Sequence, residues 1–138
     1  MQIMKNKKAI ILNPAYTLLF QSKGILKVLW ELYPNHPLLL ETSDKPLANK
    51  KCVRKPVFGR EGANVAIIEA SGETSLETQG AYGNEKMIYQ EFVEFNEHKD
   101  ECYQAGVFFA YEGCGLGFRK GGLVLDNFAK FVGHIIKE

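Results

Sequence analysis

Most of this chain consists of short extended segments separated by turn residues, and this pattern restricts it to a fold built on a sheet. The expected strands are 8–12, 52–57, 64–70, 87–95, 103–110, 115–118 and 123–125. Apolar residues recur at helical spacing early, in residues 23–33, and late, in residues 127–136. We therefore predict an α+β fold with a mostly antiparallel sheet, one early helix and one late helix.

Local signals define where these helices begin and end. Ser22 is the predicted N-cap of the first helix, and Pro34 ends it. Asn127 is the predicted cap of the late helix. Positions 25, 26, 29, 30 and 33 of the first helix and 128, 131, 132 and 135 of the second are expected to form buried stripes. The polar segments 41–50 and 71–84 are predicted loops, the second either a lid edge or an insertion without function.

Size and charge limit the class of protein. The 138 residues, 46% hydrophobic and 24% charged, fit a single domain spanning residues 1–138. A net charge of +1 gives no field that would attract nucleic acid or a membrane surface. The apolar stretch 9–20 is broken by Asn13 and is too short to cross a bilayer of about 30 Å. Three cysteines without metal-ligand spacing predict reduced thiols, a cytoplasmic location and no metal site.

Residues 54–65, Arg-Lys-Pro-Val-Phe-Gly-Arg-Glu-Gly-Ala-Asn-Val, place two cations before a glycine loop. Glycines such as Gly62 allow backbone N–H groups to approach an anion. Lys55 supplies a point charge, and Arg60 supplies a planar fork for phosphate. The segment predicts a loop over a polyphosphate, although Gly-Arg-Glu-Gly is equally typical of a hairpin turn with solvated charges. Alternation places Lys55 and Arg54 on opposite faces, so one of them should face a cleft.

Further motifs follow one another along nearly the whole chain. They are Ser-Lys-Gly-Ile-Leu from Ser22, Leu-Trp-Glu-Leu-Tyr-Pro-Asn-His-Pro from Leu29, Lys-Pro-Val-Phe-Gly-Arg-Glu-Gly-Ala-Asn-Val from Lys55, Met-Ile-Tyr-Gln-Glu-Phe from Met87, Gly-Cys-Gly-Leu-Gly-Phe-Arg from Gly113 and Leu-Val-Leu-Asp-Asn-Phe-Ala-Lys-Phe-Val from Leu123. Together they resemble the carboxy-terminal part of glutathionylspermidine synthase-like ATP-grasp ligases. The resemblance is nearer to the stand-alone synthase-like members than to the bifunctional synthetase/amidase.

The resemblance implies an ATP site between two α+β subdomains, with a lysine from each wall reaching the phosphates. Lys23 and Lys55 match these lysines. Arg60 matches an arginine of a mobile loop, and Arg119 matches a second arginine near the acyl-phosphate site. The two arginines are therefore the expected catalytic residues, since guanidinium groups stabilise the charge of a transferring phosphoryl group.

Residues 87–95 match the adenine hinge of the family. Backbone groups around Glu91 and Val93 are expected to donate a hydrogen bond to adenine and accept one from it, with Ile88 and Phe92 near the ring. Gln90 either contributes an amide contact or is a plain edge-strand glutamine. With Gly62, these residues complete the expected cofactor-binding set.

Departures from the family pattern restrict what this chain is expected to do by itself. Family members are several times longer, and their magnesium-binding carboxylates and much of the acceptor site lie in a preceding region without a counterpart here. The Glu-Pro pair of the family appears here as Asn13-Pro14. We therefore expect ATP and Mg²⁺ as cofactors, with the metal ligands outside this chain. Whether the chain is an enzyme is left open.

Two functional hypotheses remain. The first is the nucleotide-binding portion of an ATP-dependent carboxylate–amine ligase, which forms an amide through an acyl phosphate and acts on a peptide or polyamine substrate with an upstream half-protein. The second is a truncated, non-catalytic relic that serves as a binding or self-association module, and it implies a homo-oligomer.

Overall fold

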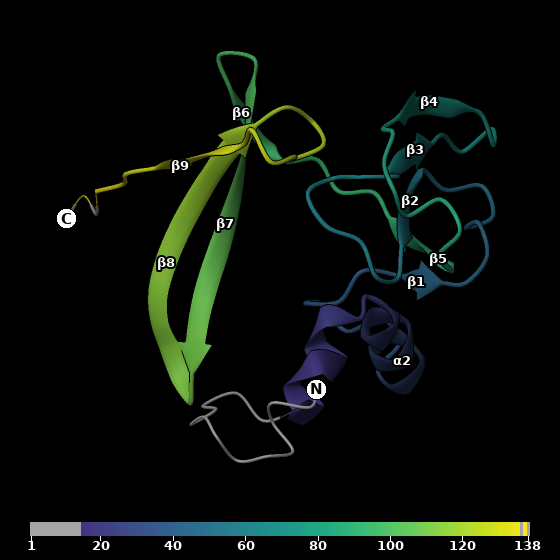
Figure 1. Ribbon diagram of the computed structural model, residues 1–138, viewed down its shortest axis with the longest axis horizontal. Helices are drawn as coiled ribbons and strands as arrows, with labels where there is room; N and C mark the ends of the chain where they lie inside the picture. Colours follow the sequence, from purple (N-terminus) through teal and green to yellow (C-terminus); the bar gives the residue numbers. More distant parts are fainter. Residues whose placement is uncertain (1–14, 136, 138) are drawn as a thin grey trace.

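The computed structural model describes residues 15–135 and 137 of the chain. In chain order its elements are η1 (Ala15–Gln21), α2 (Gly24–Leu32), β1 (Thr42–Ser43), β2 (Cys52–Pro56), β3 (Ala66–Ile68), β4 (Thr74–Glu77), β5 (Met87–Glu91), β6 (Asn96–His98), β7 (Glu101–Ala110), β8 (Glu112–Gly121) and β9 (Lys130–Val132) (Figure 1). The fold is α+β, and every strand pair is antiparallel, as predicted. The strand expected at 8–12 and Asn13-Pro14 lie outside the described residues.

The early helix is present, but its first turn differs from the prediction. Lys23, not Ser22, occupies the N-cap position of α2, and no side chain caps the helix. The backbone N–H of Lys23 donates to the carbonyl of Val57 at 3.0 Å, which ties the start of α2 to the end of β2. No residue of α2 is fully buried, and Tyr33 is exposed, so the predicted stripe is only half-covered.

A five-stranded sheet in the order β1-β5-β2-β3-β4 carries the core. Cys52, Ala66, Ile67 and Ile88 are buried there, with exposed fractions of at most 2%. Burying a side chain such as Ile67 contributes about 1.5–3 kcal/mol relative to leaving it in water. The helices lie below this sheet in Figure 1. Strands β2 and β5 are held at the centre of the sheet, which makes them a rigid support for polar side chains.

Two segments predicted to be loops each contribute a short strand to that sheet. Thr42–Ser43 of the segment 41–50 forms β1, and Thr74–Glu77 of the segment 71–84 forms β4. Both are edge strands, β1 beside β5 and β4 beside β3. The sequence pattern did not predict β1 and β4 because an edge strand buries few side chains and can therefore be polar, while its pairing comes from backbone hydrogen bonds.

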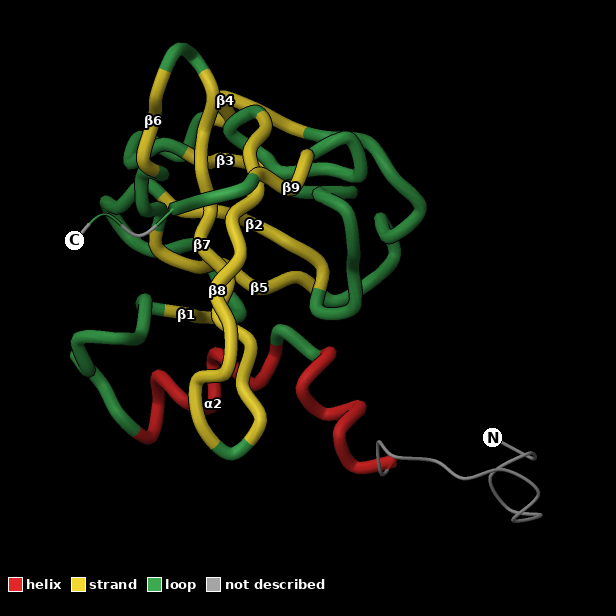
Figure 2. The backbone as a smooth tube through the Cα atoms, turned by 90° about the vertical axis from the view of Figure 1, so that its left-hand side faces the viewer, coloured by secondary structure: helices red, strands yellow, loops and turns green. Residues whose placement is uncertain are grey.

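The second sheet has the order β6-β7-β8-β9 and is dominated by the β7–β8 hairpin. The strands β6 and β9 pair only with residues 101–103 and 118–120, so the rest of the hairpin is a two-stranded ribbon. Figure 2 shows this ribbon extending to its tip without a neighbouring strand. The pairing of β7 with β8 contains a register shift between Phe108 and Phe109, opposite the glycine run of β8.

The late part of the chain contradicts two predictions. Residues 123–125 form a bend instead of a strand, and the expected helix at 127–136 is replaced by β9 followed by irregular chain as far as the described residues extend. Phe128, Phe131 and Ile135, expected to be buried, are exposed. Phe131 faces Arg119 across β8 and β9, so strand pairing overrode the helical spacing.

Candidate functional site

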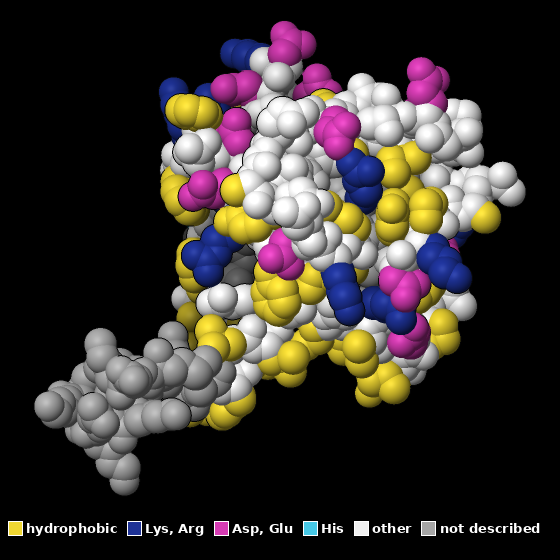
Figure 3. Space-filling model, turned by 45° about the vertical axis from the view of Figure 1, so that its right-hand side comes forward, with side chains coloured by type: hydrophobic (Ala, Val, Ile, Leu, Met, Phe, Trp, Pro, Cys, Tyr) yellow, Lys and Arg dark blue, Asp and Glu magenta, His cyan; other side chains and the backbone are white. Residues whose placement is uncertain are grey.

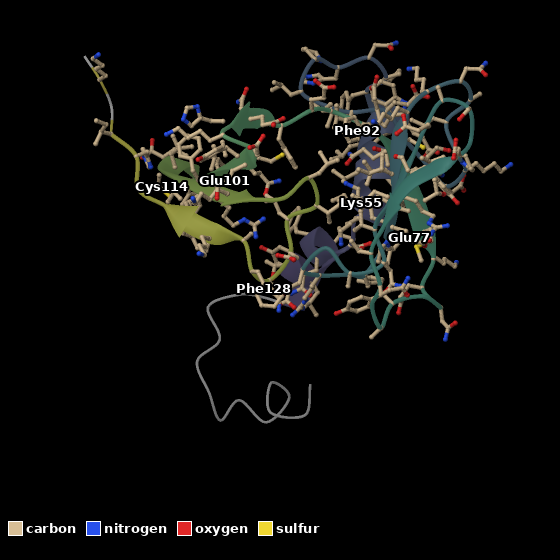
Figure 4. The ribbon with its side chains drawn as sticks, turned by 90° about the horizontal axis from the view of Figure 1, so that it is seen from above. Lys55, Glu77, Phe92, Glu101, Cys114 and Phe128 are labelled. Atoms are coloured by element: carbon tan, nitrogen blue, oxygen red, sulfur yellow. The ribbon has the colours of Figure 1, made fainter. Side chains whose placement is uncertain are left out.

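An open cavity of about 320 Å³ is lined by residues from both sheets. Strands β2, β3 and β5 and the segment that follows β5 form one side, while Gln104 of β7, Arg119 of β8 and residues 123–125 form the other. Figure 4 shows Lys55 and Phe92, which line it, on the part of the molecule that carries the five-stranded sheet. The cavity is a mixture of apolar walls and a few polar groups, which is typical of small-molecule sites.

The structure brings most of the predicted site residues to this cavity. Those that line it are Lys55, Gly62, Gln90, Glu91, Val93 and Arg119. They come from distant parts of the sequence and meet because β2 pairs with β5 and the β7–β8 hairpin returns beside them. Lys23 and Arg60 are not among the lining residues. Their proposed contacts with a ligand remain predictions.

Lys55 is the cation of β2 that faces the cavity. Its ammonium group donates to Gln90 Oε1 at 2.7 Å. Arg54, on the opposite face of the strand, pairs with Glu77 of β4 instead. Burial lowers the pKa of Lys55, and the positive charge of Lys23 lowers it further. The alternation prediction is therefore confirmed, and the structure selects Lys55 as the residue in the cleft.

Lys23 and Arg60 form a second group of cations beside Lys55. The Lys23 ammonium donates to the carbonyl of Gly59 at 2.6 Å, and Arg60 Nη2 donates to Gln21 Oε1 at 3.3 Å. Burial lowers the pKa of Lys23, and the charge of Arg60 adds to this effect. Lys23 therefore feels the positive charge of Arg60, and Lys55 feels that of Lys23.

Arg119 enters the cavity from the hairpin. Its Nη2 donates to Gln104 Oε1 at 2.8 Å, and the two residues are direct partners across β7 and β8. Phe131 lies opposite Arg119 on the other side of β8, and Gln104, Arg119 and Phe131 also line a smaller adjoining pocket. The guanidinium group is thus anchored to the four-stranded sheet, which forms one side of the cavity.

None of these four cations has a carboxylate partner within the described part of the chain. Lys23, Lys55, Arg60 and Arg119 are all held by carbonyl or amide oxygens. By contrast, the cations that pair with Asp or Glu are Lys27, Lys50, Lys51, Arg54 and Lys120. Neutral acceptors orient a cation without cancelling its charge. The arrangement therefore leaves an excess of positive charge at the cavity, which suits a multiply charged anion.

Comparison with known proteins identifies the family. The family model described as glutathionylspermidine synthase preATP-grasp matches residues 1–137. The chain belongs to the glutathionylspermidine synthase preATP-grasp family. This confirms the resemblance that the sequence motifs predicted.

Proteins similar to this chain are named as a ligase or as synthetases. The chain is 32% identical over 134 residues to a putative acid–amine ligase of Haemophilus influenzae, covering 89% of this chain and 34% of that relative. It is 33% identical over 104 residues to trypanothione synthetase of Crithidia fasciculata, covering 73% of this chain and 16% of the relative. Against the bifunctional glutathionylspermidine synthetase/amidase of Escherichia coli, identity is 29% over 92 residues, or 64% of this chain and 15% of the relative. The chain thus spans about a third or less of the length of these relatives.

The segment after β5 lines the cavity, and two of the backbone N–H groups at its start are already hydrogen-bonded. The N–H of Glu91 donates to the carbonyl of Glu41 at 2.8 Å, and the N–H of Phe92 donates to the carbonyl of Lys51 at 3.1 Å. The N–H of Val93 donates to no other described residue. Phe92 lines the cavity, whereas Ile88 does not and is buried in the core of the sheet. Of the two apolar residues expected near a base, only Phe92 therefore lines the cavity, and its contact with a base remains a prediction.

The described residues do not fit a magnesium site. No group of three or more His, Cys, Asp or Glu side chains comes together in residues 15–135 and 137. Glu91 contributes the cavity's carboxylate, and Mg²⁺ usually requires several oxygen ligands in octahedral geometry. Within the same residues, no helix is long and apolar enough to cross a membrane.

Sequence reasoning missed three parts of the site. Gln104 and the segment 123–125 line the cavity, and Thr42 contacts Gln90 behind it. Two of these depend on the pairing register: Gln104 opposes Arg119, and Thr42 opposes Gln90. A strand-prone sequence contains no information on which residue of another strand it opposes, so only the turn lengths between the strands could have hinted at these contacts.

Proposed function

We propose that this chain is the nucleotide-binding portion of an ATP-dependent carboxylate–amine ligase. The observation that carries the proposal is the cavity with Lys55 and Arg119 on its walls, Lys23 and Arg60 near Lys55, and no carboxylate paired with any of them among the described residues. Such a set attracts a polyphosphate, and its apolar wall near Phe92 and the N–H of Val93 suit the adenine base. The proposed location is the cytoplasm, which the three free cysteines support.

In the proposed reaction, a carboxylate oxygen attacks the γ-phosphorus of ATP and ADP leaves, giving an acyl phosphate. An amine then attacks the acyl carbon and expels phosphate, so an amide forms. Lys23 and Lys55 hold the phosphates, while Arg60 and Arg119 stabilise the negative charge that spreads over the transferring group. We place the ligands of Mg²⁺ and the sites for the peptide or polyamine substrate outside this chain, in an upstream half-protein.

The overall charge does not favour a larger anion such as nucleic acid. The net charge is +1, and Figure 3 shows Lys and Arg side chains interspersed with Asp and Glu on the face in view. A surface that binds nucleic acid usually carries a continuous basic patch. The excess positive charge is instead local to the cavity, which favours a small polyphosphate.

Calorimetric titration of Mg-ATP, tripolyphosphate and adenosine into the chain tests the proposal. The Lys55→Ala variant should bind ATP and tripolyphosphate about 10- to 150-fold more weakly, because a charge-assisted contact contributes about 1.5–3 kcal/mol. Adenosine affinity should be unchanged. Lys50→Ala is the matched control, since Lys50 pairs with Glu41 and does not line the cavity. Equal ATP affinity of folded Lys55→Ala and wild type, or no saturable binding by wild type, would contradict the proposal.

One observation favours the alternative of a self-association module. The free part of the β7–β8 ribbon exposes Val107, Phe108, Phe109 and Tyr111, the last two at 76% and 102% of their maximal area. Exposed apolar patches mark interaction surfaces, and a ribbon with two open edges can pair with a second copy. Sedimentation of wild type and Phe109→Ser over a range of concentrations tests this. A concentration-dependent dimer that the variant lacks would support it, and a wild-type monomer at millimolar concentration would exclude it.

A further inference from the structure

Two polar side chains are buried at the wall of the cavity: Gln90 lines it, and Thr42 lies behind Gln90. Thr42 of β1 is 2% exposed and Gln90 of β5 is 9% exposed, and they are direct partners across the two strands. A buried hydroxyl or amide destabilises the fold by about 1–3 kcal/mol unless it is hydrogen-bonded. The edge strand β1 has only two residues, and one of them is the threonine opposite Gln90.

These side chains form a directed series of hydrogen bonds that ends at Lys55. Lys55 Nζ donates to Gln90 Oε1 at 2.7 Å, and Gln90 Nε2 donates to Thr42 Oγ1 at 3.2 Å. The Thr42 hydroxyl in turn donates to the carbonyl of Leu40 at 3.0 Å. A hydroxyl has a single hydrogen, so the Thr42 oxygen can only accept from Gln90 once that hydrogen is used. The direction of the whole series is therefore fixed.

The fixed direction matters because the amide of Gln90 has a donor end and an acceptor end. An ammonium group has only donors, so Lys55 requires the oxygen of Gln90. If the amide were reversed, two donors would face a cation that burial and the charge of Lys23 already make costly to keep charged. Of the other charged groups at the cavity, Glu91 and Arg119 make no ion pair or hydrogen bond with Lys55.

We propose that Thr42 is a positioning residue for the nucleotide site. Its hydroxyl holds the Gln90 amide with the oxygen toward Lys55, which keeps the ammonium group aimed into the cavity in its charged form. This inference rests on the proposed function in one respect, namely that Lys55 binds the phosphates of ATP. One bond to Gln90 uses one of the three N–H donors of Lys55, so the others are available to an anion.

The test compares Thr42→Val, which keeps the branched shape but removes the hydroxyl, with Thr42→Ser, which keeps the hydroxyl. Thr74→Val, an exposed threonine-to-valine change in β4 of the same sheet, is the matched control. For each folded variant, the pKa of the Lys55 ammonium is measured by NMR without nucleotide, and Mg-ATP affinity is measured by calorimetry. In Thr42→Val we expect the Lys55 pKa to fall by about one unit and ATP affinity to fall about tenfold. Both quantities should stay at wild-type values in Thr42→Ser and Thr74→Val.

The NMR measurement separates this inference from the proposed function. An unchanged Lys55 pKa in Thr42→Val, or an equal fall in Thr42→Ser, would overturn the role of the hydroxyl. If the pKa falls as expected but neither wild type nor any variant binds ATP, Thr42 still orients Gln90 and the proposed function fails. Conversely, if the wild-type protein binds ATP but the pKa of Lys55 is unchanged in Thr42→Val, the proposed function stands and only the positioning role of Thr42 is excluded.

A second background separates an effect on the orientation of Gln90 from an effect of Thr42 on packing. In Gln90→Glu, a carboxylate presents an oxygen to Lys55 in either orientation, so the hydroxyl of Thr42 is no longer needed to select it. The pKa of Lys55 in the double variant Thr42→Val/Gln90→Glu should therefore equal that in Gln90→Glu alone. A fall equal to that seen with Gln90 in place would show that Thr42 acts on Lys55 by packing, which would overturn the proposal.

Discussion

Replacing Gly62 with alanine should destabilise the fold more than the same change at Gly72 or Gly122. Gly62 has a φ of +68°, and a Cβ there would lie 2.9 Å from Val124 Cγ1 and 3.0 Å from the carbonyl oxygen of Leu125. The left-handed conformation costs alanine about 1–2 kcal/mol, and overpacking costs a further 1–3 kcal/mol or so. After allowance for about 0.4–1 kcal/mol gained through the less flexible unfolded chain, we expect a loss of about 2–4 kcal/mol.

Two other glycines divide this loss into its causes. Gly72 has a φ of +90° with no atom within 4 Å of its added Cβ, so Gly72→Ala has the conformational strain without the clash. We expect it to lose about 0.5–1.5 kcal/mol. Gly122 has neither a left-handed backbone nor a neighbour within 4 Å, so Gly122→Ala should be close to neutral. The excess of Gly62→Ala over Gly72→Ala then measures the contact between the glycine loop and residues 123–125.

Urea denaturation, followed by the fluorescence of the single tryptophan, Trp30, and by circular dichroism, provides the measurement. A loss of 2–4 kcal/mol is a large part of the roughly 5–15 kcal/mol that stabilises a domain. Equal losses in Gly62→Ala and Gly72→Ala would refute the reasoning, because the loop would then not pack against Val124 and Leu125. A loss below about 0.5 kcal/mol at Gly62 would also refute the left-handed conformation.

Three further predictions concern the core and the cations. Because Ile67 is 2% exposed, Ile67→Ala should lower the free energy of unfolding by about 2–5 kcal/mol and Ile67→Val by about 0.5–1.5 kcal/mol, as measured by urea denaturation. Similar losses in both variants would contradict close packing around Ile67. The pKa of Lys55 in the folded protein lies below its usual 10.5, so between these two pKa values the unfolded chain binds more protons than the folded one. The free energy of unfolding should therefore rise with pH across that window, and it should rise less in Lys55→Met. Parallel curves of unfolding free energy against pH for the two proteins would contradict this. Gln104→Glu would place a carboxylate on Arg119 and should weaken Mg-ATP binding about tenfold in calorimetry, with Gln104→Asn as the neutral control; unchanged affinity would argue against Arg119 as a phosphate ligand.

Some of the fold was accessible from local sequence signals. The early helix, the antiparallel character of the sheet and the approximate positions of β2, β3, β5, β7 and β8 were predicted. The prediction of a late helix was wrong. The spacing of Phe128, Phe131 and Ile135 is compatible with a helix, but pairing with β8 made part of that segment a strand. The edge strands β1 and β4 were missed because their pairing requires no apolar pattern.

For the site, the sequence by itself determined which residue types were available: a cationic strand before a glycine loop, and an arginine after the glycine run that ends at Gly117. It also determined that Lys55 and Arg54 face opposite ways, since side chains alternate along any strand. Only the tertiary structure decided that Lys55 faces the cavity while Arg54 pairs with Glu77. It also supplied neutral acceptors for the cations, as Gln90 does for Lys55, and brought Arg119 across from the other sheet. The physical reason is that alternation is a property of neighbouring residues, whereas register and burial depend on segments far apart in the chain.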